Sequence, residues 1–233
     1  MPKLTFFNLP EEKRNLILEL AIDEFAGHVY QNASISNIVA RAGIAKGSFY
    51  QYFEDKRDLY FYLVELAAAE KKRFLAQHPP PDPAMDLFDY LRWLVRVGTT
   101  FELSHPKLAQ VAFRALYVER PFGDEVLDHV QRGALGFYRS LLQMGVAQGS
   151  VDPEIDMDVA VFIVSTLFAE FGRRLIEQLQ LSVDDLSAGS IAYQDLDVEA
   201  MENHLISFLE RGLRPRPRAE RDKPHAAGQE PVP

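Results

Sequence analysis

Residues 34–59 read SISNIVARAGIAKGSFYQYFEDKRDL, and this stretch decides the fold. It begins with Ser34, a good N-cap, ahead of a short helix whose apolar residues recur at three- and four-residue spacing, namely Ile35, Ile38, Val39 and Ala42. Gly43 ends that helix, and a second short helix over 45–53 follows almost at once. Two short helices joined by a glycine-containing turn and packed on a third form a helix-turn-helix, whose second helix is sized to enter the major groove of DNA.

Helical spacing extends outward from this stretch in both directions. Upstream, apolar residues recur at helical spacing from Pro10 onward. Downstream, Asp55 and Asp58 have the pattern of an N-cap with a first-turn carboxylate, and they open a long helix over 55–76. After the proline run at 79–83, further helices are predicted over 84–104, 106–118, 122–148, 156–180 and 196–213.

No alternating strand pattern competes with these helices, so we predict an all-α protein. An N-terminal three-helix helix-turn-helix domain is expected over 1–54. A larger helical bundle is expected over 55–213, and its first helix, 55–76, connects the two. Residues 214–233 are Pro-rich and charged, which predicts a disordered tail.

The net charge of −9 is distributed unevenly along the chain. Residues 1–75 contain ten Lys or Arg and ten Asp or Glu, whereas residues 76–213 contain ten against 21. The neutral N-terminal part can still present a basic surface, because the field at a phosphate depends on charges within about 8–10 Å. The chain has no cysteine, no apolar stretch near 18 residues and no signal-like N-terminus, so we expect a cytoplasmic protein without a membrane span.

Helical geometry divides the second short helix into two faces. Phe49 and Phe53 point toward the first two helices, whereas Gly47, Ser48 and Gln51 point the opposite way. The glutamine can pair with an adenine edge, and the glycine lets backbone approach closely. Hydroxyl and amine groups suited to phosphate are those of Ser48, Tyr50, Tyr52, Lys46 and Lys56, with Ser34 and Ser36 at the start of the preceding helix. Each residue alone also fits a half-buried or solvated position, but the pattern as a whole favours a DNA-binding role for this face.

Segment 34–59 closely resembles the DNA-binding region of the TetR family of transcriptional regulators, and the resemblance extends back through the first helix. It implies a homodimer whose first three helices bind double-stranded operator DNA and whose larger domain holds the dimer interface and an effector pocket. We therefore expect a ligand-responsive regulator without a cofactor, not an enzyme. Specifically, we expect a repressor of a palindromic operator that a small hydrophobic effector releases. The DNA-contacting roles implied are those of Ser34, Ser36, Lys46, Gly47, Ser48, Tyr50, Gln51, Tyr52 and Lys56.

Two positions depart from the family pattern. Val29 stands where the family usually has a glycine after the first helix, and glycine comes two residues earlier, at Gly27. A β-branched residue suits a left-handed turn poorly, so the exit from that helix is expected to differ. Ala45 replaces a hydroxyl residue at the start of the second short helix, so a cap or phosphate contact is expected to be missing there.

The larger domain is rich in aromatic residues, although any single one also fits an ordinary helix-bundle core. Side chains with a polar handle are the better effector candidates. The candidate effector residues are Trp93, Phe101, Phe113, Arg114, Tyr117, Phe137, Tyr138, Phe162 and Glu170. By resemblance, the last two helices form a four-helix dimer interface through Val159, Ile163, Thr166, Leu167, Met201, Leu205, Phe208 and Leu209.

Two other classes of protein remain open on the residues alone. Glu102-x-x-His105 resembles half of the di-iron site of an all-helical metal-dependent enzyme, but that site needs a second such motif and two more glutamates. The sequence has no second copy. A helical adaptor without DNA binding would leave the face of lysine, serine and tyrosine unexplained.

Overall fold

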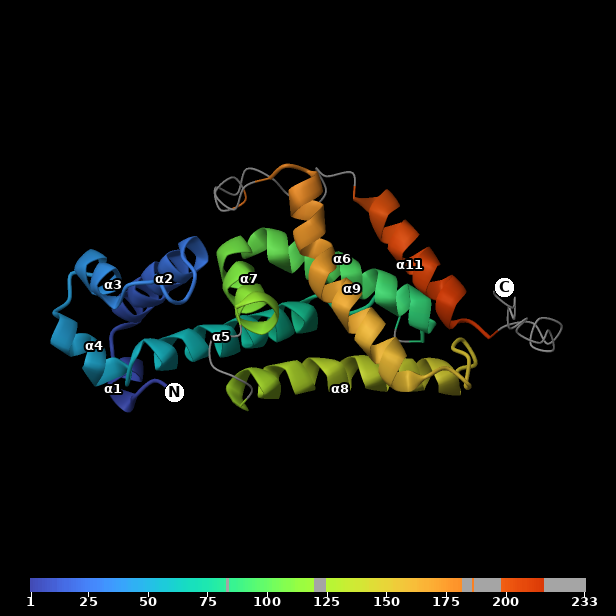
Figure 1. Cartoon of the computed structure of the whole chain (residues 1–233), viewed down its shortest axis with the longest axis horizontal. Coiled ribbons are helices and arrows are strands. Elements are labelled where there is room, and N and C mark those ends of the chain that lie inside the picture. Colours follow the sequence, from blue (N-terminus) through green and yellow to red (C-terminus); the bar gives the residue numbers. More distant parts are fainter. Residues whose placement is uncertain (83, 120–124, 182–185, 187–197, 216–233) are drawn as a thin grey trace, which may run out of the picture.

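We analysed a computed structural model that describes residues 1–82, 84–119, 125–181, 186 and 198–215, without the side chains of 125–129 and 131. Every regular element in these residues is helical, which confirms the predicted all-α class. The elements in chain order are α1 Leu4–Phe7, α2 Glu11–Gly27, α3 Ile35–Arg41, α4 Lys46–Tyr52, α5 Lys56–Gln77, α6 Leu87–Ser104, α7 Pro106–Phe113, the π-helical turn η1 Arg114–Val118, α8 Glu125–Ala147, α9 Met157–Gln178 and α11 Glu199–Leu213 (Figure 1).

The N-terminal unit consists of α1 to α4 and the first half of α5. Ser34 and Asp55 cap α3 and α5, because each side chain accepts a hydrogen bond from the backbone N–H three residues later. Gly43 joins α3 to α4 with φ of +63°, a conformation that glycine adopts without steric cost. The core of this unit is a buried cluster that includes Phe6, Ile17, Phe25, Ile38, Phe49, Phe53, Leu59, Leu63 and Val64.

A second buried cluster holds α6, α8, α9 and α11 together, with members that include Leu87, Leu91, Leu142, Val161, Val164 and Ile206. Helices α8 and α9 pack along each other, and α11 packs on α6. Gly145 is needed where α8 passes the start of α6. A Cβ at this position would lie 2.5 Å from the Cδ2 atom of Leu87 and 2.7 Å from Val151.

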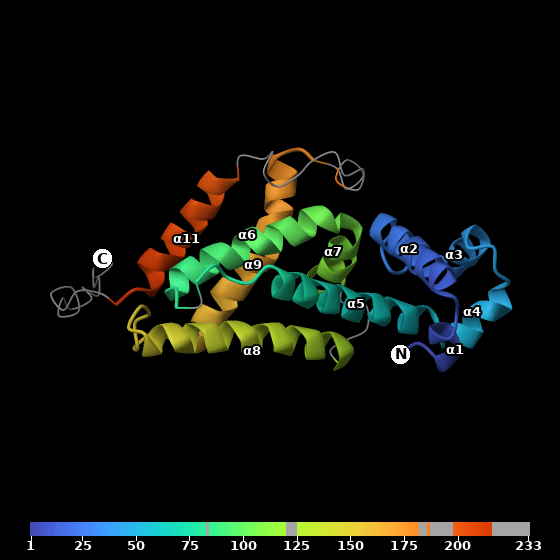
Figure 2. The ribbon, with the colours of Figure 1, turned by 180° about the vertical axis from the view of Figure 1, so that it is seen from behind.

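The molecule is elongated, with α2, α3 and α4 at one end and α11 toward the other (Figure 1). Helix α5 runs between the two units, and α7 lies beside both α2 and α5 in the front and back views (Figure 2). Val111 of α7 and Ala115 of η1 are members of the N-terminal core. The two units are therefore joined by shared apolar packing, and the division at 54/55 stays a prediction.

The two departures from the family pattern have clear local outcomes. Helix α2 ends in an extended His28, with φ of −130°, and the next carbonyl, that of Val29, accepts from the N–H groups of Asn32 and Ala33 at 2.9 and 3.1 Å. Among the described non-glycine residues only Gln180 has a positive φ, so this exit uses no left-handed residue at Val29. Ala45 gives α4 no side-chain cap, as predicted.

The helices agree with the sequence prediction apart from α1, which the sequence pattern did not indicate, one further segment and the helix ends. Segment 106–118 is not a single α-helix, because α7 ends at Phe113 and continues as the π-helical turn η1. Residues 122–124 and 196–197 of two predicted helices lie outside the described residues, as does 216–233 of the predicted disordered tail. In the part of the chain that the structure describes, no helix has the length and apolarity needed to cross a membrane.

Candidate nucleic-acid interface and ligand pocket

Helix α4 presents one face to the protein core and the other to solvent. Phe49 is 1% exposed, whereas Gly47, Tyr50 and Gln51 are exposed and Ser48 is half-buried. This is the division of faces that helical spacing predicted. A Cβ built at Gly47 would meet no atom within 4 Å, so the glycine leaves open space on this face instead of fitting a tight contact. The outer face therefore consists of backbone, a hydroxyl, an amide and a phenol.

The N-terminal ends of α3 and α4 are joined by a direct contact. The Lys46 Nζ atom donates to the Ser36 Oγ atom across 3.1 Å, and both side chains are exposed. The start of α3 already has an acidic partner, because the Ser34 N–H donates to the Glu24 Oε1 atom at 2.8 Å. Glu24 is 5% exposed. Ser34 therefore has only its hydroxyl proton to offer a phosphate, and its backbone N–H is not available.

The structure corrects the expected role of Tyr52. This side chain is 7% exposed and belongs to the N-terminal core, with its ring 6.2 Å from that of Phe6. Tyr52 lies one turn after Ser48 on α4, and the packing of α1 against the end of α4 covers it. Most of this side chain therefore packs within the protein and not on the outer face of α4, so we do not keep Tyr52 in the candidate DNA-contacting set.

Lys56 also has a different role from the expected one. Its Nζ atom donates to the carbonyl oxygens of Tyr30, Gln31 and Ala33 at 2.8, 3.2 and 3.0 Å. It also lies 4.5 Å from the centre of the Tyr30 ring. An ammonium has three protons, and all three are used within the protein. Lys56 closes the loop between α2 and α3, and in this arrangement it has no proton for a phosphate.

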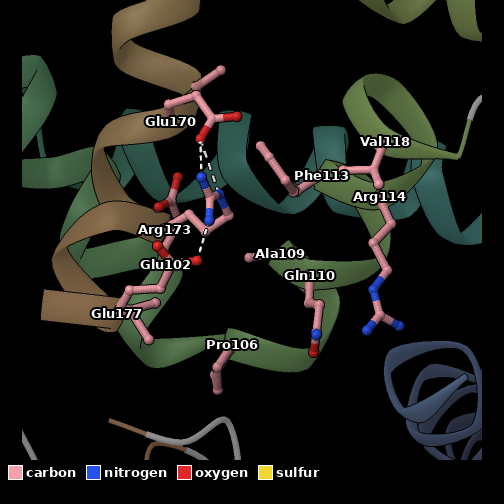
Figure 3. Close-up of a pocket in the computed structure, with 12 residues that line it drawn as sticks. Glu102, Pro106, Ala109, Gln110, Phe113, Arg114, Val118, Glu170, Arg173 and Glu177 are labelled. Atoms are coloured by element: carbon pink, nitrogen blue, oxygen red, sulfur yellow. Dashed lines mark hydrogen bonds and ion pairs between the residues drawn. The ribbon is translucent and has the colours of Figure 1, made fainter. Parts of the chain in front are cut away.

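A pocket of about 440 Å³ lies between the end of α6, α7 with η1, and α9 (Figure 3). Its apolar wall consists of Pro106, Ala109, Phe113, Val118, Ala169 and Ile176. Its polar lining consists of Glu102, Gln110, Arg114, Glu170, Arg173 and Glu177. A volume of this size with an apolar wall and a few polar groups is typical of small-molecule sites.

The charged groups of the pocket are arranged in pairs. Arg173 lies between two carboxylates on α9: its Nε atom donates to Glu170 at 2.9 Å, and its Nη1 atom donates to Glu177 (Figure 3). Glu102 pairs with Lys71 of α5 at 3.1 Å. Burial, with a further contribution from the carboxylates of Glu102 and Glu170, raises the pKa of the Tyr117 hydroxyl. A ligand in this pocket would meet paired charges beside an apolar wall.

The predicted effector residues are only partly brought together. Phe113, Arg114 and Glu170 line the pocket, and Tyr117 stacks on Phe113 with ring centres 5.4 Å apart. Tyr138 lines a separate cavity of about 30 Å³ on the other side of Glu102. The remaining four do not line the 440 Å³ pocket: Phe101 is 2% exposed in the core, Trp93 is half-buried on the second core cluster, and Phe137 and Phe162 are exposed.

Sequence reasoning missed the pocket residues Arg173 and Glu177. Their spacing, Glu170-x-x-Arg173-x-x-x-Glu177, places all three side chains on one helical face and was the available signal. Glu102 was considered only with His105 as half of a metal site. In the structure Glu102 pairs with Lys71, and the His105 ring stacks on Phe101 with centres 4.8 Å apart.

Arg114 joins the pocket to the N-terminal unit. While it lines the pocket, its Nη1 atom donates to the carbonyl oxygens of Ala26 at 2.8 Å and Phe25 at 3.5 Å, at the end of α2. Figure 3 shows its side chain extending away from the Glu170–Arg173 pair. Glu119, just beyond η1, accepts a hydrogen bond from the Tyr30 N–H at 2.7 Å. The wall of the pocket therefore contacts α2 and the loop that follows it.

A second link between the units is ionic. Asp23 of α2 accepts from Lys107 of α7 at 2.8 Å and from Arg41 of α3 at 3.0 Å. Partial burial acts to raise the pKa of Asp23, but the hydrogen bonds and positive charges of Lys107 and Arg41 outweigh that effect and lower it below its usual value. Asp23 is thus an ionised bridge between α7 and two helices of the helix-turn-helix.

The predicted dimer residues divide by exposure. On α9, Val159, Ile163 and Thr166 are exposed, and so is Phe162, a predicted effector residue. Phe208 on α11 is 68% exposed. Leu167, Met201 and Leu205 are half-buried. Leu209 is 2% exposed in the second core cluster, because this side of α11 packs on α6, so it cannot contact another subunit.

Comparison with known proteins is consistent with this arrangement. Residues 17–63 match the family profile described as bacterial regulatory proteins, tetR family, and residues 85–214 match that of the tetracyclin repressor-like C-terminal domain. A curated relative, the probable acrEF/envCD operon repressor of Escherichia coli K12, is 29% identical over 161 residues, which cover 67% of this chain and 72% of the relative.

Solved structures extend the likeness along most of the chain. A TetR family transcriptional regulator from Chloroflexus aurantiacus is 43% identical with a TM-score of 0.81, and the match covers 93% of this chain and 100% of that one. The fatty acid degradation regulator FadR from Bacillus halodurans is 25% identical with a TM-score of 0.62, covering 86% of this chain and 99% of that one.

Proposed function

The chain belongs to the TetR family of transcriptional regulators, and we propose that it is a repressor that binds a palindromic operator and leaves it when a small effector fills the pocket behind α7. The observation that carries this proposal is Arg114, because this residue lines the pocket while its guanidinium binds the carbonyl of Ala26 at the end of α2. The enzyme and adaptor alternatives are set aside because both halves of the chain match profiles of a regulator family. We propose that it acts in the cytoplasm, where operator DNA lies.

We assign the DNA contacts to the outer face of α4 and the start of α3. Gln51 reads a base edge, with Gly47 allowing the backbone of α4 to approach the groove. The proposed phosphate contacts are Ser36, Lys46, Ser48 and Tyr50, with the Ser34 hydroxyl at the edge of the set. Lys46 and Ser36 contact each other directly, so one phosphate oxygen can be bound by both. The two buried or fully engaged side chains, Tyr52 and Lys56, support this face from within.

The effector site is proposed to be the 440 Å³ pocket. An effector with an apolar body suits the wall formed by α7 and α9, and a polar end suits the Glu170–Arg173 pair. One similar solved structure is that of a fatty acid degradation regulator, which makes fatty acids the first compounds to test. Release requires only that the effector binds the DNA-incompetent state more tightly than the competent one.

We propose that the dimer forms through the exposed apolar face of α9 together with Phe208 of α11. Phe162 and Phe208 are 66% and 68% exposed, a costly arrangement for phenylalanines in water. Val159, Ile163 and Thr166 continue the same surface along α9. A two-fold dimer would place its two recognition helices about one DNA turn apart, roughly 34–36 Å, and so requires a palindromic site.

The decisive experiment is selection of bound DNA from a random pool by the full chain, followed by repetition with candidate effectors. We expect enrichment of a palindrome, and loss of binding when a fitting apolar compound is present. Compounds are screened first by the rise in unfolding temperature that any ligand of the native state produces. Absence of an enriched palindrome would contradict the proposal. A compound that stabilises the protein without weakening DNA binding would contradict the effector role of the pocket.

A further inference from the structure

The recognition helix α4 has an unusual set of partners at its C-terminal end. The last four carbonyls of a helix lack partners within it. The carbonyl of Phe49 accepts from the N–H of Phe53 at 2.9 Å. The next three all accept from the chain's N-terminal segment: Tyr50 from the Lys3 Nζ atom at 2.8 Å, Gln51 from the Thr5 hydroxyl, and Tyr52 from the Lys3 N–H at 2.8 Å.

Apolar packing holds the same segment against α4. Phe6 is completely buried, and its ring centre lies 4.8 Å from that of Phe53 and 6.2 Å from that of Tyr52. Figures 1 and 2 show α1 lying against the end of α4 and the start of α5. We call Lys3, Thr5 and Phe6 the N-terminal clamp. It joins residues that are more than 40 positions apart in the sequence.

The other end of α4 is held differently, through the Lys46 side chain, which donates to Ser36 of α3 at 3.1 Å. Ala45 provides no side-chain cap there, and the seven residues of α4 are too few to form a stable helix alone. The direction of this helix therefore depends on its flanks. A bidentate contact between glutamine and a base tolerates little displacement of the helix that presents it.

We propose that the N-terminal clamp is a positioning element for sequence reading: by satisfying the last three carbonyls of α4, it fixes the direction in which Tyr50 and Gln51 meet DNA. This inference rests on the proposed function of α4 as the recognition helix. Lys3 and Thr5 act through α4, not as contacts to DNA. The clamp is expected to affect discrimination between DNA sequences more than general attraction to DNA.

The test compares Thr5→Val with Thr5→Ser and Leu4→Ala in the full chain. Valine keeps the shape of threonine but cannot donate to the Gln51 carbonyl, whereas serine can. Leu4 is 80% exposed in the same segment and serves as the control. The probes are the palindrome selected by the unmodified protein and a scrambled duplex. Thr5→Val is expected to weaken palindrome binding about threefold to tenfold, the range of one hydrogen bond, with scrambled-duplex affinity and salt dependence unchanged. Thr5→Ser and Leu4→Ala are expected to match the unmodified protein.

Amide exchange across residues 50–53 provides a readout that needs no DNA. Exchange is expected to be faster in Thr5→Val than in Thr5→Ser, while helices α8 and α9 remain unchanged. The inference would be overturned if Thr5→Val discriminated between the palindrome and the scrambled duplex as well as the unmodified protein does. It would also be overturned if Thr5→Val lost affinity equally for both duplexes. If the unmodified protein selects no palindrome, the proposed function fails, and unchanged exchange in Thr5→Val would separately overturn the clamp.

Discussion

The guanidinium of Arg114 and the carbonyl of Ala26 are 2.8 Å apart, and this contact connects the pocket wall with the last turn of α2. Arg114 lies at the first position of the π-helical turn η1. Such turns occur often at functional sites, where an extra residue redirects side chains. We therefore expect an effector that moves the wall at Arg114 to change how α2 is held.

The first prediction is that Arg114→Met uncouples effector binding from DNA release. Coupling between two sites is typically about 1–3 kcal/mol, or roughly 5–150-fold in affinity, and this variant is expected to lose most of it. The measurement is operator affinity with and without a saturating effector. Arg173→Met is the matched control: this second pocket arginine donates to Glu170 and Glu177 of α9 and lies 5.6 Å from the centre of the Phe113 ring of α7, and none of these partners belongs to α2. The proposed coupling role would be refuted if Arg114→Met responded to effector as fully as the unmodified protein.

The second prediction separates a base reader from a buried neighbour on the same helix. Gln51→Ala is expected to lose discrimination at one position of each half-site, a change of about 1–3 kcal/mol between the preferred base and its competitors. Tyr52→Phe is expected to bind with unchanged preference, because that side chain is 7% exposed in the core. Affinities for a panel of single-base operator variants decide the matter. Full discrimination by Gln51→Ala would remove it from the proposed set.

The third prediction contrasts two lysines of the N-terminal unit. Lys46 is exposed beside Ser36, so Lys46→Met is expected to weaken binding to all duplexes and to reduce the slope of log affinity against log salt by about 1. Lys56→Met is expected to leave that slope unchanged and to lower the free energy of unfolding by about 1.5–3 kcal/mol, because three loop carbonyls lose a charged donor. Salt titrations measure the first effect and urea unfolding the second. A reduced slope in Lys56→Met would show that Lys56 contacts a phosphate in the complex.

The helix-turn-helix was predictable from sequence because local signals determine it. Ser34, Gly43 and Asp55 act within a few residues of their own positions. In the structure Ser34 caps α3, Gly43 forms the turn before α4, and Asp55 caps α5. The outcome for Tyr52 was not predictable in this way. Its exposure depends on Phe6, a residue from a short N-terminal helix that periodicity did not indicate. A helical wheel assigns directions but does not show which of them another segment covers.

The pocket was less predictable for the same reason. Phe113, Arg114 and Glu170 were found by their chemistry, but Arg173 and Glu177 become pocket residues only because α9 crosses the end of α6. The aromatic residues Phe101 and Phe162 show the limit of composition as evidence, since one is in the core and the other faces solvent. Whether a residue lines the pocket, the core or the surface depends on how distant helices cross, and a local sequence pattern carries no information about those crossings.

The fourth prediction concerns the closeness of α9 to α6. A Cβ added at Gly172 would lie 1.6 Å from the Glu102 Oε2 atom, so Gly172→Ala forces that carboxylate away from its position. Because the clashing atom ends a flexible side chain, the expected cost is at the low end of overpacking, about 1 kcal/mol for displacing the carboxylate from Lys71, and the better helix propensity of alanine offsets part of it. Gly136→Ala on α8 is the control: nothing lies within 4 Å, so this change is expected to stabilise by about 0.5–1 kcal/mol. Urea unfolding measures the stability of both variants. If the double variant Gly172→Ala/Glu102→Ala regained the stability lost in Gly172→Ala, the clash would be identified as the cause.

The fifth prediction concerns pH and the ionic bridge at Asp23. Lys107 and Arg41 lower the pKa of this carboxyl in the folded protein, whereas in the unfolded chain it returns to about 3.9. Because the folded pKa is the lower one, ionised Asp23 stabilises the protein at all pH values above about 4, and this contribution is lost as pH falls through the folded pKa. Asp23→Asn removes the titrating group while keeping its shape.

The difference in unfolding free energy between the unmodified protein and Asp23→Asn is therefore expected to be constant from pH 7 to about pH 5 and to shrink below pH 4. Raising the salt concentration is expected to reduce the difference at pH 7, because about a third of the Asp23 side chain is exposed to screening ions. Glu19→Gln, an exposed change on the same helix, controls for the loss of one carboxylate. A difference that grew as pH fell would show that Asp23 does not act as an ionised bridge between α7 and α3.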